Sequence, residues 1–399
     1  METRAKKAGI YCFWAAVLIE LLLVIIDKSA YINPYEGQLF RLTFLLFMVK
    51  ILTTEYSRNE ILFLGMVGTV AVVSYFVNTK DEAVRAVALV AACKDIDLRR
   101  LLKVVLFVTI AGMAVLFVLS VTGIYGAVSV TADYGRGSGP LDPYYETRYC
   151  FGMGHPNAFQ GMLFMVSTLG MYLYAERMKL CHFLAVGLVG FVFYLFTDSN
   201  TGFIVLAAAI AGVMLMKYSQ VARESRLLYL LAALFFIALV AFSAYGSHTG
   251  RDTPVMYKID RILNGRFQYS NIYEAARVEH WKLFGAAAND VFFDQGFIRL
   301  FYWYGIIPAA VYLLGNLYLI GQSYLKKDYS LCVIVTAYAV FSMMEAHLVS
   351  VYLLRNYLLL FMGYYWYQPF LERGETQGYL WQPRRILAGD KASKTGGSI

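Results

Sequence analysis

The sequence contains few of the residues from which metal and disulfide sites are usually built. Its five cysteines are scattered through 399 residues with no CxxC pair, so neither a disulfide framework nor a cysteine zinc site is expected. No group of His, Cys, Asp or Glu has metal-ligand spacing, and there is neither a P-loop nor a GxGxxG motif. We therefore expect a protein that uses no metal and no cofactor.

Charge is also scarce, because only 16% of the residues are Asp, Glu, Lys or Arg. A soluble domain is about a quarter charged. In contrast, 59% of the residues are hydrophobic, and they occur in blocks of about 17 to 25, the length that spans a bilayer. This pattern predicts an all-α polytopic membrane protein. About twelve spans are expected, at 9–26, 39–54, 60–78, 82–93, 102–124, 157–175, 182–197, 201–216, 227–245, 296–321, 331–348 and 351–368.

The distribution of Lys and Arg indicates how the chain crosses the membrane. With the N-terminus inside, the loops that carry most of the basic residues also fall inside, as the positive-inside rule requires. Two long loops, at about 125–156 and 246–295, then lie outside. We expect one integral-membrane domain over 1–370 and a cytoplasmic, partly disordered tail over 371–399. The net charge of +8 mostly reflects the loops and indicates no nucleic-acid partner.

The stretch RYCFGMGHPNAFQG, residues 148–161, ends the first long loop and begins a span. Pro156 suits the first position of a helix, where its missing N–H would have no partner, so His155 is the expected N-cap. A helix N-terminus favours anions, and Arg148 can fold back towards it. Two interpretations are open: an anion-binding pocket, or an ordinary capped helix with one solvated arginine.

Two further stretches are expected to shape the outer face. The tight turn TDSNTG at 197–202 should direct a second helix N-terminus towards that face, with Asp198 among the cap residues. In the second long loop, residues 271–285 predict a short helix that lies along the membrane surface. One face of that helix would carry Tyr273, Arg277, His280 and Phe284.

Ionisable side chains inside spans are costly and usually face protein or a wet cavity. The candidates are Glu20, Arg41, Arg299, Glu345 and Arg355, with His347 close to Glu345. The arginines among them fall in the outer half, as do Arg148, His155 and Arg266 in the loops. This distribution predicts one outward-facing cluster that binds phosphate oxygens. The alternative is snorkelling and pairing, with Arg355 bound to Glu345.

Several motifs follow one another within about residues 60–365. They are Arg148 with GHPNAF at 154–159, TDSNTG at 197–202, LNGR at 263–266, LFG at 283–285, and DQGF at 294–297 leading into YGII at 304–307. With these motifs the chain resembles the Wzy-type polysaccharide polymerases, relatives of the O-antigen ligases. Asn200 departs from the pattern, because the family often has Arg at that position.

The resemblance implies a metal-independent glycosyltransferase of the GT-C type in the bacterial cytoplasmic membrane. Such enzymes join undecaprenyl-diphosphate-linked repeat units on the outer face, and the lipid diphosphate is the leaving group. Expected partners are the lipid-linked glycan donor and acceptor, membrane lipid, a chain-length regulator and a flippase. Diphosphate contacts are expected from Arg148, Arg266 and Arg277, with Arg299 and Arg355 as further candidates. The base could be His155, His280, Glu345 or His347, and the other expected site residues are Asn157, Asp198 and Asp294.

Two other functions are open at this point. Twelve spans and buried charges suit a lipid-linked oligosaccharide flippase equally well. Two long outer loops without matching inner ones argue against such a transporter, as does the lack of a two-fold internal repeat. An O-antigen-type ligase would use the same donor with a different acceptor.

Overall fold

The computed structural model describes residues 4–134, 145–372 and 379–381. Most of the predicted tail and the tip of the first long loop lie outside the described residues. The first half of the chain forms α1 (Arg4–Lys28), α2 (Glu36–Leu52), β1 (Tyr56–Ser57), α3 (Arg58–Asn78), α4 (Glu82–Ala92), α5 (Leu98–Val121), β2 (Ser129–Asp133), β3 (Tyr145–Tyr149), α6 (Pro156–Tyr174), η1 (Ala175–Arg177) and α7 (Leu180–Thr197).

The second half is also mainly helical. It forms α8 (Asn200–Tyr218), α9 (Gln220–Glu224), α10 (Arg226–Thr249), α11 (Pro254–Ile262), α12 (Arg266–Ile272), α13 (Gly296–Tyr304), α14 (Ile306–Leu325), α15 (Tyr329–Met344), α16 (Leu358–Tyr365), α17 (Gln368–Glu372) and β4 (Tyr379–Trp381). Four short 3-10 turns lie between them: η2 (Glu274–Ala276), η3 (Val278–His280), η4 (Ala346–Leu348) and η5 (Leu353–Arg355).

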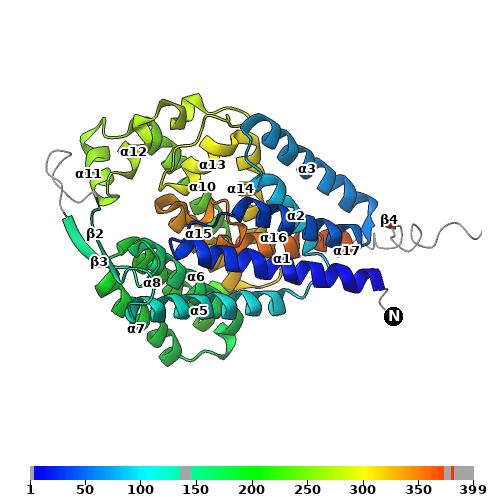
Figure 1. Ribbon diagram of the computed structural model, residues 1–399, viewed down its shortest axis with the longest axis horizontal. Helices are drawn as coiled ribbons and strands as arrows, with labels where there is room; N and C mark the ends of the chain where they lie inside the picture. Colours follow the sequence, from blue (N-terminus) through cyan, green and yellow to red (C-terminus); the bar gives the residue numbers. More distant parts are fainter. Residues whose placement is uncertain (1–3, 135–144, 373–378, 382–399) are drawn as a thin grey trace, which may run out of the picture.

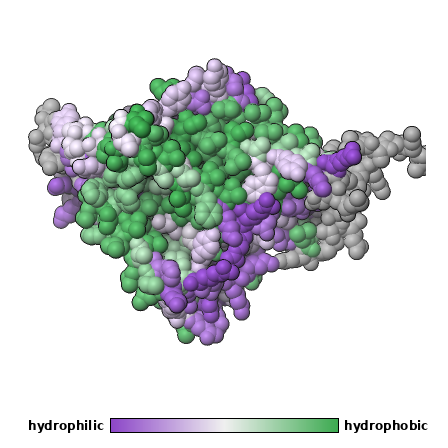
Figure 2. All heavy atoms as spheres, turned by 60° about the horizontal axis from the view of Figure 1, so that its bottom comes forward, coloured by the Kyte–Doolittle hydropathy of each residue, from purple (hydrophilic) through white to green (hydrophobic). Residues whose placement is uncertain are grey.

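Eight helices in the described parts of the chain are long and apolar enough to cross a membrane. They are α1, α3, α5, α6 with η1, α7, α8, α10 and α14, and the shorter α15 is also apolar. Figure 2 shows hydrophobic residues over much of one face, with hydrophilic residues at its margins. Soluble monomers rarely expose so large an apolar surface. These features agree with the all-α membrane class predicted from the sequence.

The expected span at 296–321 is not one helix but two. The chain breaks at Gly305, whose φ of 88° is readily adopted only by glycine. The backbone of residues 282–285 fills the break, because the Gly285 N–H donates to the Tyr304 carbonyl and the Ile306 N–H donates to the Lys282 carbonyl, each at 2.9 Å. A Cβ on Gly305 would lie 2.5 Å from atoms of Phe284. The close approach of the 282–285 backbone therefore divides this segment into two helices, although its apolar sequence is continuous.

Two other predicted helical segments also differ from the structure. The expected span at 351–368 contains only the 3-10 turn η5 and the eight-residue helix α16. The surface helix predicted over 271–285 is wrong, because α12 ends at Ile272 and only η2 and η3 follow. Trp281 instead stacks on Phe301 with ring centroids 4.0 Å apart, and its indole N–H donates to the Ala276 carbonyl. The packing of Trp281 and the hydrogen bonds that residues 282–285 make with residues 304–307 override the helical periodicity.

The elements of the two long loops gather at one end of the helical body. Figure 1 shows β2, β3, α11 and α12 at that end, and the N-terminus and β4 at the opposite end. The central helix α6 packs against α5, α7, α8 and α15, and most of its residues are buried. Its first residue, Pro156, lies at the loop end. The N-terminus of a rigid, buried helix thus meets the loop segments there.

Candidate functional site

A polar cavity of about 390 Å³ lies where these loop segments meet the helix ends. We call it the polar cavity. The β2–β3 hairpin, the start of α6, the α7–α8 turn, the start of α12 and the segment before α13 all contribute to its wall. The lining residues are Asp133, Tyr134, Arg148, His155, Asn157, Asp198, Ser199, Asn200, Thr201, Asn264, Gly265, Arg266, Tyr269 and Asp294.

His155 is the N-cap of α6 and Pro156 occupies the first turn, as predicted from the sequence. The Asn157 N–H donates to Nδ1 of His155 at 3.1 Å. A neutral imidazole that accepts at Nδ1 carries its proton on Nε2. Partial removal from water lowers the pKa of His155, and the charges of Arg148 and Arg266 act in the same direction. The ring is therefore neutral at pH 7 and has an N–H to donate from Nε2.

Arg148 is placed by the β2–β3 hairpin, in which it lies opposite Val130. Its Nη2 lies 2.5 Å from Oε1 of Glu146 and 3.5 Å from Oδ2 of Asp198. The guanidinium also lies over the ring of Tyr134, 4.2 Å from its centroid. The buried Nε of Arg148 has no hydrogen-bond partner among the described residues. Arg148 is thus fixed in place and retains an unused donor.

Arg266 opens α12 directly after Gly265, whose φ of 76° is left-handed. Its Nε donates to the Met344 carbonyl at 2.5 Å, and its Nη1 donates to the Leu263 carbonyl at 3.2 Å. Its Nη2 lies 2.5 Å from Oε1 of Glu345. Asp294 is more distant, with its carboxylate 4.0 Å from the same Nη2. Backbone and carboxylate acceptors together hold this side chain at the cavity wall.

Glu345 lies just beyond the end of α15 and joins two segments of the cavity wall. Its Oε1 accepts hydrogen bonds from Arg266 and from Nδ2 of Asn157, the second at 3.0 Å. Burial raises the pKa of Glu345 to about 7, and the charge of Arg266 opposes this shift. The predicted pair of Arg355 with Glu345 is wrong, because Arg355 pairs with Asp27. A buried carboxyl group paired with Arg266 thus lies directly behind the cavity wall.

The α7–α8 turn brings a second helix N-terminus to the polar cavity. Asp198 adopts a left-handed φ of 48°, and Asn200 accepts a hydrogen bond from the Tyr194 hydroxyl at 2.9 Å. Gly202 packs so closely on Gln160 of α6 that a Cβ would lie 2.6 Å from its side chain. This contact sets the first turn of α8 beside that of α6. Ser199 is the N-cap of α8 and makes no side-chain cap hydrogen bond, whereas Asp198, which the sequence predicted among the cap residues, is the C-cap of α7.

The other predicted site residues do not line the polar cavity. Nε of Arg277 donates to the Asn271 carbonyl at 2.8 Å, and the exposed His280 lies 3.4 Å from Glu274. Arg299 is buried over the ring of Phe292 and donates to the Val349 carbonyl. His347 contacts Phe341, and its buried Nε2 has no hydrogen-bond partner in the described part of the chain. Arg41 is exposed. The single arginine-rich cluster predicted from the sequence is therefore reduced to Arg148 and Arg266 with His155.

Three cavity residues were not predicted from the sequence: Asp133, Tyr134 and Tyr269. Tyr134 packs edge-on against His155 with ring centroids 5.5 Å apart, in addition to its contact with Arg148. No sequence signal marks it, because it follows β2 in a segment without periodicity. Tyr269 could have been found, since it lies three residues after Arg266 and residues at that spacing share a helix face.

Comparison of the chain with protein-family models, with curated proteins and with solved structures finds no match. The described residues contain no group of three or more His, Cys, Asp or Glu that could hold a metal ion. Function must therefore be argued from the polar cavity itself. Its wall combines two guanidinium groups, one neutral imidazole N–H, two helix N-termini and several carboxylates. Such a set can bind an anion and neutral hydroxyl groups at the same time.

Replacing His155 tests the helix cap separately from any ligand. His155→Ala removes the acceptor for the Asn157 N–H, so we expect the free energy of unfolding to fall by about 1 kcal/mol. His155→Asn keeps an acceptor at the N-cap, so its free energy of unfolding should be close to that of the wild type. Denaturant unfolding of the purified protein in detergent measures both variants. Equal midpoints for wild type and both variants would show that this cap adds no stability.

Proposed function

We propose that the protein is a polymerase that joins undecaprenyl-diphosphate-linked oligosaccharide repeat units into a surface polysaccharide. The observation that carries the proposal is the polar cavity at the N-terminus of α6. Its two arginines come from separate segments, β3 and α12, and several carboxylates accompany them. A lipid-linked sugar diphosphate needs cationic groups for its phosphates and hydrogen-bonding groups for its sugars, and this wall offers both.

In this proposal the diphosphate lies between Arg148 and Arg266. The guanidinium groups of Arg148 and Arg266, the Nε2–H of His155 and the first N–H groups of α8, whose Ser199 cap makes no side-chain hydrogen bond, are the donors that we assign to an anion there. These donors are held in place before substrate binds, so they can stabilise the charge that develops on the leaving diphosphate. Asp198 and Asp294 would accept hydrogen bonds from sugar hydroxyls.

Glu345 is the proposed general base. The acceptor hydroxyl attacks the anomeric carbon of the donor, the bond from that carbon to the diphosphate oxygen breaks, and the hydroxyl proton passes to Glu345. A base works best when its pKa lies near the working pH, and burial raises the pKa of Glu345 to about 7. A diphosphate that draws Arg266 away would raise that pKa further. His155 is a poor base in this arrangement, because its Nε2 already carries the proton.

The proposed membrane placement follows from the distribution of Lys and Arg. We place about twelve GT-C-like membrane segments in the bacterial cytoplasmic membrane, with both termini inside. The polar cavity then faces outwards, where a flippase would deliver the repeat units and a chain-length regulator would act on the product.

Purified protein in liposomes tests this function. Lipid-linked repeat units added from outside should be polymerised in EDTA, because no expected step requires a divalent metal. The product is a ladder of glycans on lipid diphosphate, resolved by electrophoresis. Liposomes carrying the Arg148→Ala, Arg266→Ala double variant are the control.

Three outcomes would contradict the proposal. Movement of intact repeat units across the bilayer without new glycosidic bonds would identify a transporter. Transfer of the glycan only to a different acceptor, such as a lipopolysaccharide core, would identify a ligase. Activity that requires added Mg²⁺ after EDTA treatment would overturn the metal-independent mechanism.

A further inference from the structure

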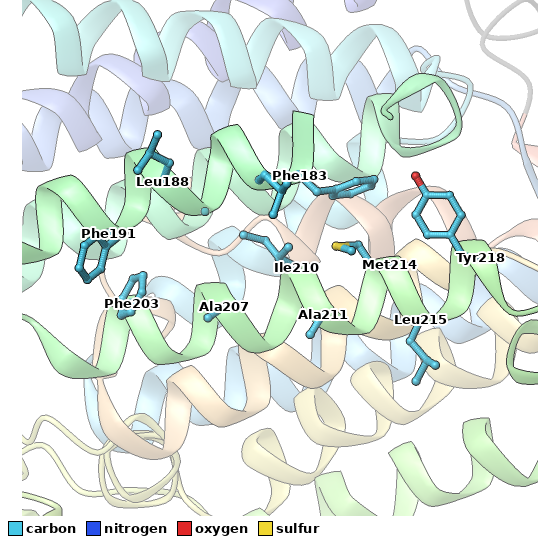
Figure 3. Close-up of a pocket in the computed structure, with 12 residues that line it drawn as sticks. Phe183, Leu188, Phe191, Phe203, Ala207, Ile210, Ala211, Met214, Leu215 and Tyr218 are labelled. Carbon is cyan, nitrogen blue, oxygen red and sulfur yellow. The ribbon is translucent and has the colours of Figure 1, made fainter. Parts of the chain in front are cut away.

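A second hollow runs between α7 and α8, and we call it the α7–α8 groove. Its volume is about 690 Å³, and its described lining residues include no charged side chain. Figure 3 shows Phe191 and Phe203 near one end and Tyr218 near the other. Small residues keep it open, among them Gly187, Ala207 and Ala211. The groove is therefore suited to a hydrocarbon chain.

The α7–α8 groove begins where the polar cavity ends. Asn200 lines the cavity, and its Oδ1 accepts the hydrogen bond from the Tyr194 hydroxyl. The Tyr194 ring stacks on Phe203, with centroids 4.9 Å apart and planes inclined by 16°. Phe203 in turn lines the groove. One pair of stacked rings at the start of α8 thus separates the polar site from the apolar one.

The dimensions of the groove fit a long chain that lies along a membrane helix. Phe203 and Tyr218 are separated by about 22 Å at a rise of 1.5 Å per residue. That is roughly three quarters of a hydrocarbon core of about 30 Å. Leu184, Leu188 and Leu215 on its rim are all more than half exposed, as expected for side chains that face lipid.

We infer that the α7–α8 groove holds the isoprenoid chain of a lipid whose diphosphate occupies the polar cavity. This inference rests on the proposed function. Asn200, in the polar cavity, and Phe203, in the groove, are only about 4.5 Å apart along the helix axis. A ligand that occupies both sites must therefore have its hydrocarbon attached directly to its phosphates. An isoprenoid diphosphate does so, whereas a glycerophospholipid places an ester-linked glycerol between phosphate and hydrocarbon.

Filling the groove tests the inference. A Cβ on Gly187 would meet only Ile210, at an ordinary distance of 3.7 Å, so Gly187→Leu should fold and occupy the hollow. We expect its KM for an undecaprenyl-linked donor to rise about tenfold, equivalent to losing the burial of roughly two methylene groups. Its KM for a donor with two isoprene units should not change, because that chain is too short to reach Gly187.

The matched control is Gly65→Leu on α3, where a Cβ would meet nothing within 4 Å. It should leave both KM values at the wild-type level. An unchanged KM of Gly187→Leu for the long donor would overturn the inference. So would an equal rise for both donors, because that result reports damage to the polar cavity rather than loss of the groove.

A cross-linking experiment separates this inference from the proposed function. Undecaprenyl diphosphate with a diazirine in its chain should label peptides of α7 and α8, even if the protein makes no polymer. Labels on α3 and α14 would place the chain in the apolar cleft of about 560 Å³ between those helices and would overturn the inference. Failure of the wild type to polymerise either donor would contradict the proposed function alone.

Discussion

The Arg148→Lys and Arg266→Lys variants are each expected to lose most polymerisation while they still fold and insert. Lysine keeps the positive charge but has one nitrogen in place of a planar fork, so it cannot reproduce paired hydrogen bonds to a phosphate. A hydrogen bond to a charged group contributes about 1.5–3 kcal/mol. Its loss in the transition state slows the step roughly ten- to hundredfold. Initial rates of glycan extension measure the effect.

The structure adds a second reason to expect this loss. Arg148 contacts Glu146 and Asp198 through Nη2 while its plane covers Tyr134. Arg266 uses three nitrogens on Met344, Leu263 and Glu345. One ammonium group cannot satisfy either set. The matched control is Arg261→Lys, an exposed arginine of α11 that does not line the polar cavity. Wild-type rates in both cavity variants would show that these arginines only support the structure.

Glu345→Gln is expected to slow transfer by about 10²–10⁴-fold, the usual contribution of a general base. Glutamine is nearly the same size and can still accept the hydrogen bonds from Asn157 and Arg266. The variant should therefore fold normally and lose the proton acceptor alone. The control is Glu274→Gln, which removes one negative charge from the exposed second loop. If Glu345→Gln slows transfer and Glu274→Gln does not, the loss comes from the missing proton acceptor and not from a change in net charge.

The pH profile gives an independent readout of the same residue. Only the ionised form of Glu345 can take a proton, and burial raises the pKa of Glu345 to about 7. The wild-type rate should therefore increase as the pH rises towards 7 and level off above it. Glu345→Gln should lack this dependence. If the variant keeps both the rate and the rising limb, the proton must go to another carboxylate, for which Asp294→Asn is the next test.

The sequence was most informative where local rules decide the structure. Pro156 and His155 define the start of α6 by their own backbone chemistry, and the observed cap matches that prediction. The apolar blocks similarly indicated the helical membrane class. Arg148 was predicted to fold back towards this helix end, and Arg266 and Asp198 were predicted to lie on the same outer face. All three line one cavity.

Contacts between distant segments could not be predicted in the same way. Glu345 and Arg355 are ten residues apart and looked like partners, yet each binds a residue from another part of the chain. The helical pattern at 271–285 was misleading because the Gly285 N–H bonds to the end of α13 and the carbonyls of Lys282 and Leu283 bond to the start of α14. The position of Tyr134 depends on the fold of a hairpin that no local signal marks.

The break at Gly305 has a consequence for the motion of the second long loop. Hydrogen bonds from Gly285 to Tyr304, and from Ile306 and Ile307 to the carbonyls of Lys282 and Leu283, join the loop to the helices α13 and α14. These amides cannot exchange with solvent deuterium unless the loop and the helix junction open together. Amide exchange at Gly285 should therefore be as slow as at Ile306 and Ile307, so that this part of the second long loop moves together with the helical body.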